Sequence, residues 1–309
     1  MKFGLYLVPT DAYPPITELA RAVEERGFDS IWVPEHSHIP TTGSTPYPGR
    51  GPVTRDFART LDPFIALTAA AAVTTKLKLG TGICLLIQRD TIHTAKTVAT
   101  LDHLSGGRVL FGVGGGWNKP EMENHGTVYA TRFQRLEEQL EALKKIWTEE
   151  EPEYHGDHVD FAPMWLWPKP VSKPHPPIFI GGETDHTLKR IAKYADGWLP
   201  RVRDPQLVLA GIGRLREFAR AEGRDPDSIA ISAFGLAAKP EAIAPFRDAG
   251  VGRAIFAIAP GTLDDQLRIA VEAAQHVVER PRRKKTTSPG ARHGGTLSPL
   301  RGSLCGAEG

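Results

Sequence analysis

The stretch Arg108-Val-Leu-Phe-Gly-Val-Gly-Gly-Gly-Trp117 joins a short apolar segment to three consecutive glycines and an aromatic side chain. An apolar run of this length is typical of a buried β-strand. Glycines at the exit of a strand leave bare backbone, which allows another group to approach closely. Glu121 follows soon after the tryptophan. This order of strand, bare loop, flat ring and carboxylate predicts one edge of a pocket for a flat ligand.

On both sides of this stretch, short apolar runs alternate with helical patterns. Nearly continuous apolar sequence indicates strands buried on both faces, as parallel strands are under helices. The strands are predicted at residues 2–8, 30–33, 77–82, 108–114, 177–180, 197–200, 229–235 and 253–259. The helices are predicted at residues 16–26, 61–74, 91–104, 132–148, 185–194, 205–221, 241–249 and 263–278. Eight strand–helix pairs predict an α/β fold, a closed (β/α)8 TIM barrel, with an open doubly wound sheet as the alternative.

Two parts of the chain stand outside this alternation. Residues 149–177 form an irregular insertion after the fourth helix, with several prolines and two tryptophans. From residue 280 the sequence is basic, rich in Gly, Ser, Pro and Thr, and without periodicity, so we expect a disordered tail. The predicted organisation is a barrel domain over residues 1–279 and a tail over residues 280–309.

Composition and charge exclude several classes of protein. A formal net charge of +2 over 309 residues is too small to indicate nucleic-acid binding. Cys84 and Cys305 stand far apart, which argues against a disulfide framework and fits a reducing compartment. The apolar run over residues 1–8 is too short for a signal peptide, and no apolar run approaches the ~18 residues of a membrane helix. We therefore expect a cytoplasmic protein with no membrane or nucleic-acid partner.

The active site of a TIM barrel lies at the carboxyl ends of its strands, so each strand exit is a candidate. The second strand ends in Glu35-His36, followed by His38, and these residue types suit proton transfer or the orientation of a ligand. The third ends in Gly82-Ile83, where small residues permit an unusual backbone course. The fourth ends in the glycine run.

The fifth strand exit carries Gly181-Gly182-Glu183-Thr184 directly before a predicted helix. Backbone N–H groups at a helix N-terminus attract anions, and the late loops of TIM barrels often hold phosphate. The segment therefore predicts a phosphate site. A plain glycine turn capped by Thr184 is the alternative.

The sequence lacks the motifs of several other kinds of active site. The glycine run is followed by Trp117 where a dinucleotide fingerprint needs Gly or Ala, which argues against a Rossmann site. The sequence has no His-Glu-x-x-His, no Cys-x-x-Cys pair, no nucleophile elbow and no P-loop. His36 and His38 could begin the metal site of a barrel hydrolase, but the eighth strand ends without the acidic ligand such a site needs. We predict no metal.

Five segments together resemble the luciferase-like monooxygenase superfamily, and more narrowly its coenzyme F420-dependent oxidoreductases. They occur in family order over about residues 1–279. They are Ala22-Val-Glu-Glu-Arg-Gly-Phe-Asp-Ser-Ile-Trp-Val-Pro-Glu-His36, Leu79-Gly-Thr-Gly-Ile83, Thr100-Leu-Asp-His-Leu-Ser-Gly-Gly-Arg108, Gly112-Val-Gly-Gly-Gly-Trp117 with Glu121, and Pro177-Ile-Phe-Ile-Gly-Gly182 with Ala195-Asp-Gly-Trp198. The chain departs from the family at Thr91, where many relatives have proline, and beyond Val278.

The resemblance implies a flavin-like ring stacked at the mouth of the barrel. It implies a non-proline cis peptide at Gly82–Ile83, against the ring. Glu35 and His36 match the acid–His pair of the F420 branch, in which the histidine contacts ring or substrate and shuttles a proton. The residues implied to line the ring and substrate are Gly114, Gly115, Gly116 and Trp117, and those implied to bind phosphate are Gly181, Gly182, Glu183 and Thr184.

On this basis we expect an F420-dependent oxidoreductase that transfers a hydride between the deazaflavin and a small organic substrate. Two alternatives stay open: an FMN-dependent monooxygenase fed by a separate flavin reductase, and a non-catalytic flavin- or deazaflavin-binding protein. Residues 37–60 and 149–177 are expected to shape the substrate pocket. Homodimers are common in the family, so a second copy of the chain is a candidate partner.

Overall fold

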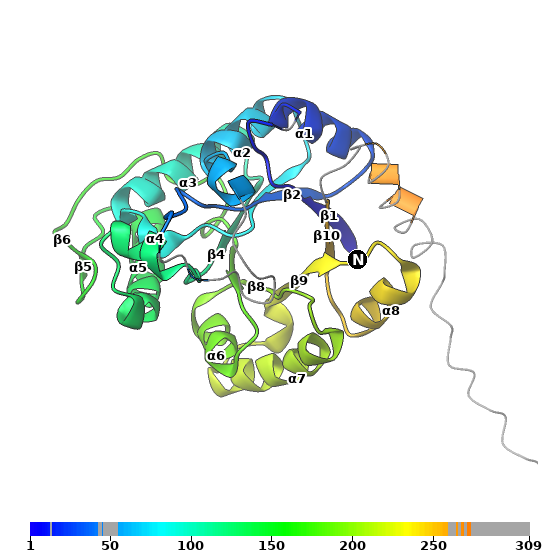
Figure 1. Cartoon of the computed structure of the whole chain (residues 1–309). Helices are drawn as coiled ribbons and strands as arrows, with labels where there is room; N and C mark the ends of the chain where they lie inside the picture. The colour runs from blue at the N-terminus through cyan, green and yellow to red at the C-terminus, as the bar shows by residue number, and fades with distance from the viewer. Residues whose placement is uncertain are drawn as a thin grey trace, which may run out of the picture.

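The computed structural model describes residues 1–12, 14–42, 45 and 55–258, together with 264, 267, 268, 271 and 272. Eight parallel strands close into a barrel in the order β1-β10-β9-β8-β7-β4-β3-β2. Helices surround this barrel (Figure 1). The predicted (β/α)8 TIM barrel is confirmed, and the open doubly wound sheet is excluded.

The bounds of the elements agree closely with the sequence pattern. The barrel strands are β1 (Lys2–Tyr6), β2 (Ser30–Val33), β3 (Lys78–Thr81), β4 (Val109–Val113), β7 (Ile178–Gly181), β8 (Gly197–Leu199), β9 (Ala230–Leu236) and β10 (Arg253–Ala257). The α-helices are α1 (Ile16–Glu25), α2 (Pro63–Ala72), α3 (Thr91–Ser105), α4 (Lys119–Asn124), α5 (Arg132–Thr148), α6 (Asp185–Tyr194), α7 (Pro205–Ala221) and α8 (Pro240–Asp248). Short 3-10 helices lie at Arg55–Arg59, Leu86–Gln88, Tyr129–Thr131 and Pro226–Ser228. The last predicted helix, residues 263–278, falls largely outside the described residues, and so does the predicted tail.

Aspartate side chains fix where several helices begin. Asp62 accepts hydrogen bonds from the backbone N–H groups of the first turn of α2, Asp90 does so for α3 and Asp204 for α7. Such caps satisfy donors that have no partner inside the helix. Helix α3 ends at Gly106, whose φ of 65° is the left-handed conformation that glycine adopts without strain. These start and stop signals set the lengths of the connections and hence the positions of the strand exits.

The interior of the barrel is filled below the strand exits. Trp32, Leu110, Phe179, Leu199 and Ile255 pack together there. The ring of Trp32 lies where a Cβ on Gly80 would stand, at 2.4 Å, so only glycine fits at that point of β3. Side chains therefore fill the interior of the barrel, and any ligand must bind at the carboxyl ends of the strands.

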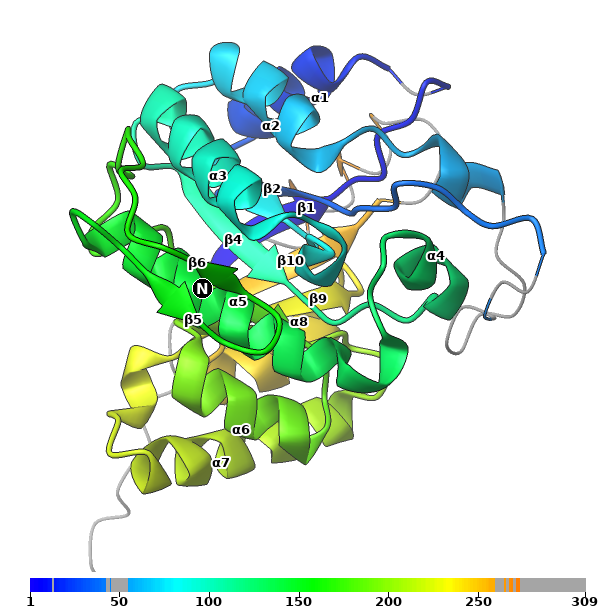
Figure 2. The same cartoon turned by 90° about the vertical axis from the view of Figure 1, so that its left-hand side faces the viewer.

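The insertion carries a small hairpin on the outer side of the barrel. Its strands are β5 (Tyr154–His155) and β6 (Asp160–Phe161), which pair antiparallel and lie beside α5 (Figure 2). The carboxylate of Glu138 on α5 accepts hydrogen bonds from the backbone N–H groups of His158 and Val159 in the hairpin turn. The insertion is thus anchored to the outer face of a helix.

None of the helices within the described ranges combines the length and the apolar character that crossing a bilayer requires.

Candidate active site

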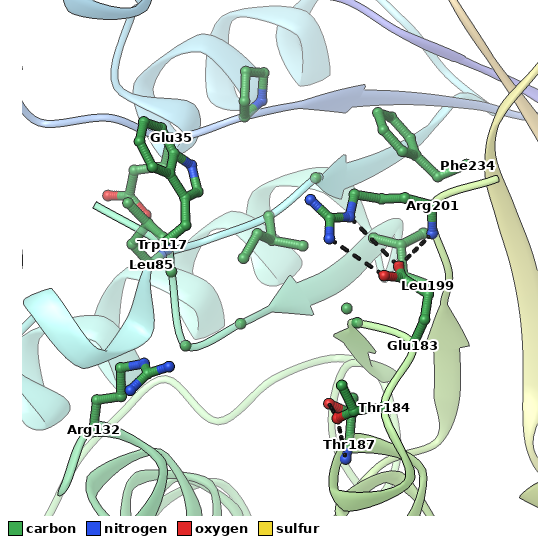
Figure 3. Close-up of a pocket in the computed structure, with 18 of the residues that line it drawn as sticks. Glu35, Leu85, Trp117, Arg132, Glu183, Thr184, Thr187, Leu199, Arg201 and Phe234 are labelled. Atoms are coloured by element: carbon green, nitrogen blue, oxygen red, sulfur yellow. Dashed lines mark hydrogen bonds and ion pairs between the residues drawn. The ribbon is translucent and has the colours of Figure 1, made fainter. Parts of the chain in front are cut away.

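A cavity of about 630 Å³ lies at the carboxyl ends of the barrel strands (Figure 3). Every residue predicted for a catalytic or cofactor-binding role lines it. They are Glu35, His36, Gly82, Ile83, Gly114, Gly115, Gly116, Trp117, Gly181, Gly182, Glu183 and Thr184. The fold thus brings four strand exits that are far apart in sequence around one space. The catalytic and binding roles of these residues stay predictions.

Sequence reasoning did not identify the rest of the lining. These residues are Tyr6, Pro34, Phe57, Leu85, Arg132, Phe133, His186, Thr187, Arg190, Leu199, Arg201 and Phe234. Arg132 could have been found, because it opens α5, the predicted helix that comes after the fourth barrel strand. Nothing distinguishes Arg190 in the middle of α6. The expectation that residues 149–177 shape the pocket is wrong for this cavity, since none of them lines it, whereas the loop after β2 contributes Phe57.

His36 is held by Glu121 at one end of the cavity. The Nδ1 of His36 lies 2.8 Å from Oε2 of Glu121, and the two side chains are 6% and 0% exposed. The carboxylate also accepts the backbone N–H of Ser37 at 3.1 Å and the side-chain amide of Asn118 at 3.5 Å. Because Ser37 and Asn118 already donate to Glu121, its carboxylate acts as an acceptor, and this favours the tautomer of His36 with the proton on Nδ1. The ring is also flanked edge-on by Trp117, 5.5 Å between ring centres.

Helix α4 supplies this carboxylate and was not predicted. It has only six residues and begins at Asn118 without a side-chain cap bond, so it lacks a readable helical period. The short helix turns Glu121 back toward His36 at the exit of β2. Glu121 was noted in the sequence, but its pairing with His36 requires the three-dimensional fold.

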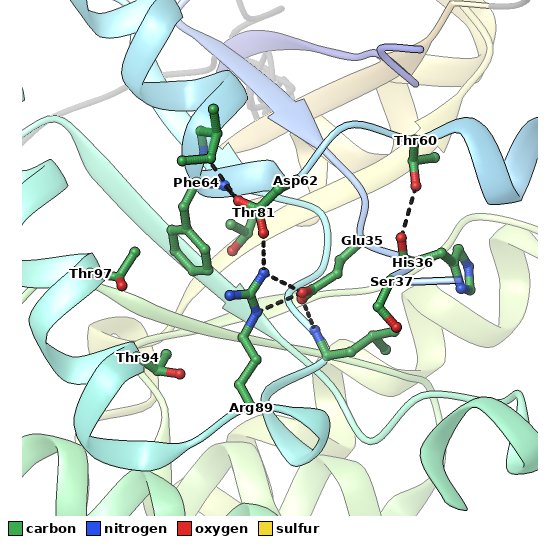
Figure 4. Close-up of polar contacts among 12 residues, drawn as sticks. Glu35, His36, Ser37, Thr60, Asp62, Phe64, Thr81, Arg89, Thr94 and Thr97 are labelled. Atoms are coloured by element: carbon green, nitrogen blue, oxygen red, sulfur yellow. Dashed lines mark hydrogen bonds and ion pairs between the residues drawn. The ribbon is translucent and has the colours of Figure 1, made fainter. Parts of the chain in front are cut away.

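The side chain of Glu35 has different polar partners from the side chain of His36. Its carboxylate accepts the backbone N–H of Leu85 and the Nε of Arg89, both at 2.6 Å (Figure 4). Arg89 also pairs with Asp62 at 2.6 Å. Burial alone would lower the pKa of Arg89, but the charge of Glu35 raises it above its usual value. Burial and the charge of Glu35 raise the pKa of the adjacent Cys84 thiol well above its usual value.

The exits of β3 and β4 form a tightly packed central wall. The Gly82–Ile83 peptide is cis, as the family resemblance implied. A Cβ on Gly114 would stand 2.3 Å from Cδ1 of Ile83, and one on Gly115 would stand 2.5 Å from the ring of Phe133. An added Cβ would therefore displace a side chain that lies against the backbone at each of these two glycines. They leave a thin, smooth wall on which a flat ligand can lie.

The exits of β7, β8 and β9 form the opposite wall. Glu183 accepts the backbone N–H of Arg201 at 2.8 Å, and their side chains pair at 3.2 Å (Figure 3). Phe234 lies beside this pair, and its ring meets the ring of Tyr6 edge-on at 4.6 Å between centres. This wall combines a charged pair with aromatic surface.

The remaining end of the cavity is cationic. The Nε of Arg132 is buried and has no hydrogen-bond partner among the described residues. The guanidinium groups of Arg132 and Arg190 both lie on the ring of Phe133, at 4.3 and 4.5 Å from its centre. Burial lowers the pKa of Arg132, and the charge of Arg190 lowers it further. Arg190 already pairs with Glu137 at 2.7 Å, so what an anion at this point would add is a partner for the orphaned donor of Arg132.

The N-terminus of α6 completes this cationic end. Thr184 caps the helix and accepts the backbone N–H of Thr187 at 3.3 Å. Gly182 has a φ of 121°, a conformation that side chains rarely adopt, so the backbone turns sharply into the helix here. Figure 3 shows Arg132 across the cavity from Thr184 and Thr187. Backbone N–H groups at a helix start and arginine side chains are donors of the kind that bind phosphate in proteins.

A metal site has no support in the part of the chain that the structure describes. No group of three His, Cys, Asp or Glu side chains is placed there to hold an ion. The two ring nitrogens of His38 contact Ser37 and Asn124, at 2.9 and 2.8 Å. His38 thus belongs to a surface hydrogen-bond network, and it does not line the cavity.

A closed parallel barrel with a cavity at its strand exits has the architecture of a TIM-barrel enzyme. The chain belongs to the luciferase-like monooxygenase family, whose model matches residues 1–292. An uncharacterized protein of Mycobacterium tuberculosis is 39% identical over 271 residues, which cover 86% of this chain and 94% of that protein. The resemblance seen in the sequence segments is confirmed at the level of the family.

Two solved structures show the same fold with different cofactors. The coenzyme F420-dependent tetrahydromethanopterin reductase from Methanopyrus kandleri matches with a TM-score of 0.71 and 20% identity, over 90% of this chain and 98% of the reductase. The oxygenating constituent of 3,6-diketocamphane monooxygenase from Pseudomonas putida, in complex with FMN, matches with a TM-score of 0.62 and 18% identity, over 78% of this chain and 69% of that one. At these identities the likeness concerns the fold.

Proposed function

We propose that the protein is an oxidoreductase that binds coenzyme F420 in the main cavity and transfers a hydride between the deazaflavin and a small organic substrate. The observation that carries this proposal is the pairing, in one cavity, of a buried His–carboxylate couple with a cationic end that holds an unsatisfied arginine donor. A phosphate-bearing cofactor with a flat ring has the two chemical parts that these two ends would accept.

The residues present fit such a cofactor. Arg132, Arg190 and the N–H groups at the start of α6 offer donors for a phosphate, and one of these donors is buried without a partner. The thin wall of Gly82, Ile83 and Gly114 offers a surface for a ring. When bound, the deazaflavin supplies or accepts the hydride, and the protein contributes position and electrostatics.

His36 would handle the proton that accompanies the hydride. Glu121 keeps the proton on Nδ1, which leaves Nε2 as the ring nitrogen that gives a proton to the substrate oxygen or takes one from it. A positive charge on the ring during this exchange is stabilised by the adjacent carboxylate. Glu35 would act indirectly, by fixing the strand exit through Arg89 and Leu85.

The mouth of the cavity would also limit water. Trp117 and Phe57 lie edge-on to His36 and, with Leu85, surround it with apolar surface. Water at this point would compete for the proton and weaken the electrostatic contacts of the site.

The charged pair of Glu183 and Arg201 lies on the wall formed by the exits of β7, β8 and β9. This pair would be a polar contact for the ring or for the substrate.

Binding titrations with F420 and with FMN, followed by absorbance or fluorescence, test the proposal. We expect saturable binding of F420 that is much tighter than that of FMN. Tight FMN binding without F420 binding would overturn the choice of cofactor and favour the second candidate, an FMN-dependent monooxygenase fed by a separate reductase. The likeness to the FMN complex from Pseudomonas putida is the observation that keeps this second candidate. A protein that binds neither would contradict both.

A further inference from the structure

The charged groups around the main cavity are distributed unequally between its two ends. We call the end that holds His36 and Glu35 the proton end. Ion pairs there join Glu121 to His36, and Glu35 to Arg89 and Asp62 (Figure 4). With His36 neutral, these three carboxylates and one guanidinium have a net charge of −2.

The cationic end carries the opposite charge. Arg190 pairs with Glu137 at 2.7 Å and Arg201 with Glu183 at 3.2 Å, so each of these pairs is neutral. The buried Nε of Arg132 has no hydrogen-bond partner among the described residues, and its charge is left for a phosphate. From these groups the cavity is negative at the proton end and positive at the cationic end.

The carboxylates of the proton end are already occupied by donors from the protein. The two oxygens of Glu35 accept the backbone N–H of Leu85 and the Nε of Arg89, both at 2.6 Å. Glu121 is fully buried and does not line the cavity. A charged ligand group beside His36 would therefore lose its water without gaining a charged partner. An anionic group would in addition be repelled by the net negative charge.

Apolar side chains form much of the surface that a substrate would meet next to His36. The rings of Phe57 and Trp117 lie edge-on to the imidazole, at 5.3 and 5.5 Å between ring centres. Leu85 also lines the cavity. Covering such surface with an apolar group is favourable, because it removes both from water. This end of the cavity therefore suits a reacting oxygen with an apolar group beside it.

We propose that the substrate is an uncharged alcohol, or the corresponding ketone or aldehyde, and that the negative charge of the proton end excludes substrates bearing a carboxylate or phosphate. This inference rests on the proposed function. In the oxidation direction, Nε2 of His36 takes the hydroxyl proton, the hydride passes from the same carbon to the deazaflavin, and the C–O single bond becomes C=O. Reduction reverses these steps. The net negative charge stabilises the imidazolium that oxidation forms.

Three methyl ketones that differ only at the far end test the inference. Methyl isoamyl ketone and levulinate have the same shape, because an isopropyl group replaces the carboxylate, and methyl levulinate is polar but uncharged. Absorbance of reduced F420 follows their reduction, and deazaflavin fluorescence follows their binding to the F420 complex. We expect kcat/KM and affinity for both neutral ketones to exceed those for levulinate at least about tenfold, which corresponds to roughly 1.4 kcal/mol.

Two variants test whether charge is the cause. Asp62→Asn removes one carboxylate from the proton end and keeps an oxygen that can cap α2. It should reduce the preference for the neutral ketones about two- to threefold, a modest effect because Asp62 is 43% exposed and partly screened. Asp204→Asn is the matched control, since Asp204 caps α7 in the same way, is exposed and does not line the cavity. It should leave the preference unchanged.

The outcomes separate this inference from the proposed function. A preference for the neutral ketones that falls in Asp62→Asn alone supports it. Equal or better use of levulinate, or a preference that is the same in both variants and the wild type, overturns it and leaves F420-dependent hydride transfer standing. An F420 complex that binds none of the three ketones also overturns the substrate class. A protein that does not bind F420 contradicts the proposed function, and the substrate class then fails with it.

Discussion

The two ends of the main cavity differ in how their polar atoms are satisfied. At the proton end, the carboxylate of Glu121 receives His36, Ser37 and Asn118, and the protein itself completes the network. At the cationic end, Arg132 and Arg190 both lie against the ring of Phe133. Arg190 pairs with Glu137, but the buried Nε of Arg132 lacks a partner among the described residues. The first end is organised before any ligand arrives, whereas the second would be completed by one.

The difference implies that the two ends have separate roles, one in the rate of reaction and one in cofactor affinity, and mutations can test this. Changes at the proton end should affect the rate of reaction and leave cofactor affinity nearly unchanged. Changes at the cationic end should affect affinity first. If single substitutions at either end changed both quantities equally, this separation of roles would be wrong.

The largest effect is expected at His36. In His36→Ala, the rate of hydride transfer should fall about 10²–10⁴-fold, because a positioned proton donor or acceptor contributes that much. The affinity for F420 should stay within a few fold of the wild type. Single-turnover absorbance of the deazaflavin, with a substrate found by screening alcohols and carbonyl compounds, measures the rate.

His38→Ala is the matched control, because His38 lies two residues further on and does not line the cavity. Its rate should equal that of the wild type. A His36→Ala protein that keeps full turnover would point to a different proton donor. A protein that binds F420 but turns over no substrate in any form would favour the non-catalytic binding protein.

A substitution at Glu35 tests whether this residue, the neighbour of His36 in sequence, shares the role of His36. Glu35→Ala leaves the half-buried Arg89 with Asp62 alone, so the free energy of unfolding should fall by about 3 kcal/mol. Chemical denaturation measures this loss, and Glu25→Ala, at an exposed site on α1, should change stability by less than about 0.5 kcal/mol. A large loss of rate with unchanged stability would instead make Glu35 a catalytic residue.

At the cationic end, Arg132→Ala should weaken F420 binding about tenfold to a hundredfold. A hydrogen bond to a charged group contributes about 1.5–3 kcal/mol, and the orphaned donor is the one a phosphate would satisfy. The rate of hydride transfer at saturating cofactor should change little. Fluorescence titration measures affinity, and Arg220→Ala, exposed on α7, is the control. Unchanged affinity in Arg132→Ala would remove Arg132 from the binding site.

The sequence predicts the barrel well because its signals are local. Apolar runs, helical periods and caps such as Asp62 are read within a few residues. The eight barrel strands, and the seven predicted helices that the structure describes in full, fall within two residues of their predicted bounds. The strand-exit rule then finds twelve lining residues without any contact information. The pairing of His36 with Glu121 and the cationic end depend on residues that meet only after closure of the barrel. Glu35 and His36 are adjacent in sequence, yet Glu35 pairs with Arg89 and His36 with Glu121. The sequence alone does not tell which partner each of these side chains has.

The smallest effect separates the helix cap at the cationic end from an ordinary cap. Thr184→Ala and Asp204→Ala each remove a side chain that caps a helix start, and each should lower the free energy of unfolding by about 1 kcal/mol. Only Thr184 lines the cavity, so only Thr184→Ala should also weaken F420 binding, by about two- to fivefold, since a helix N-terminus contributes about 0.3–1 kcal/mol toward an anion. Thr184→Ser should restore both quantities. Equal effects of the two alanine variants on affinity would mean that α6 acts through general stability, and Arg132 and Arg190 alone would then account for the attraction of phosphate to this end.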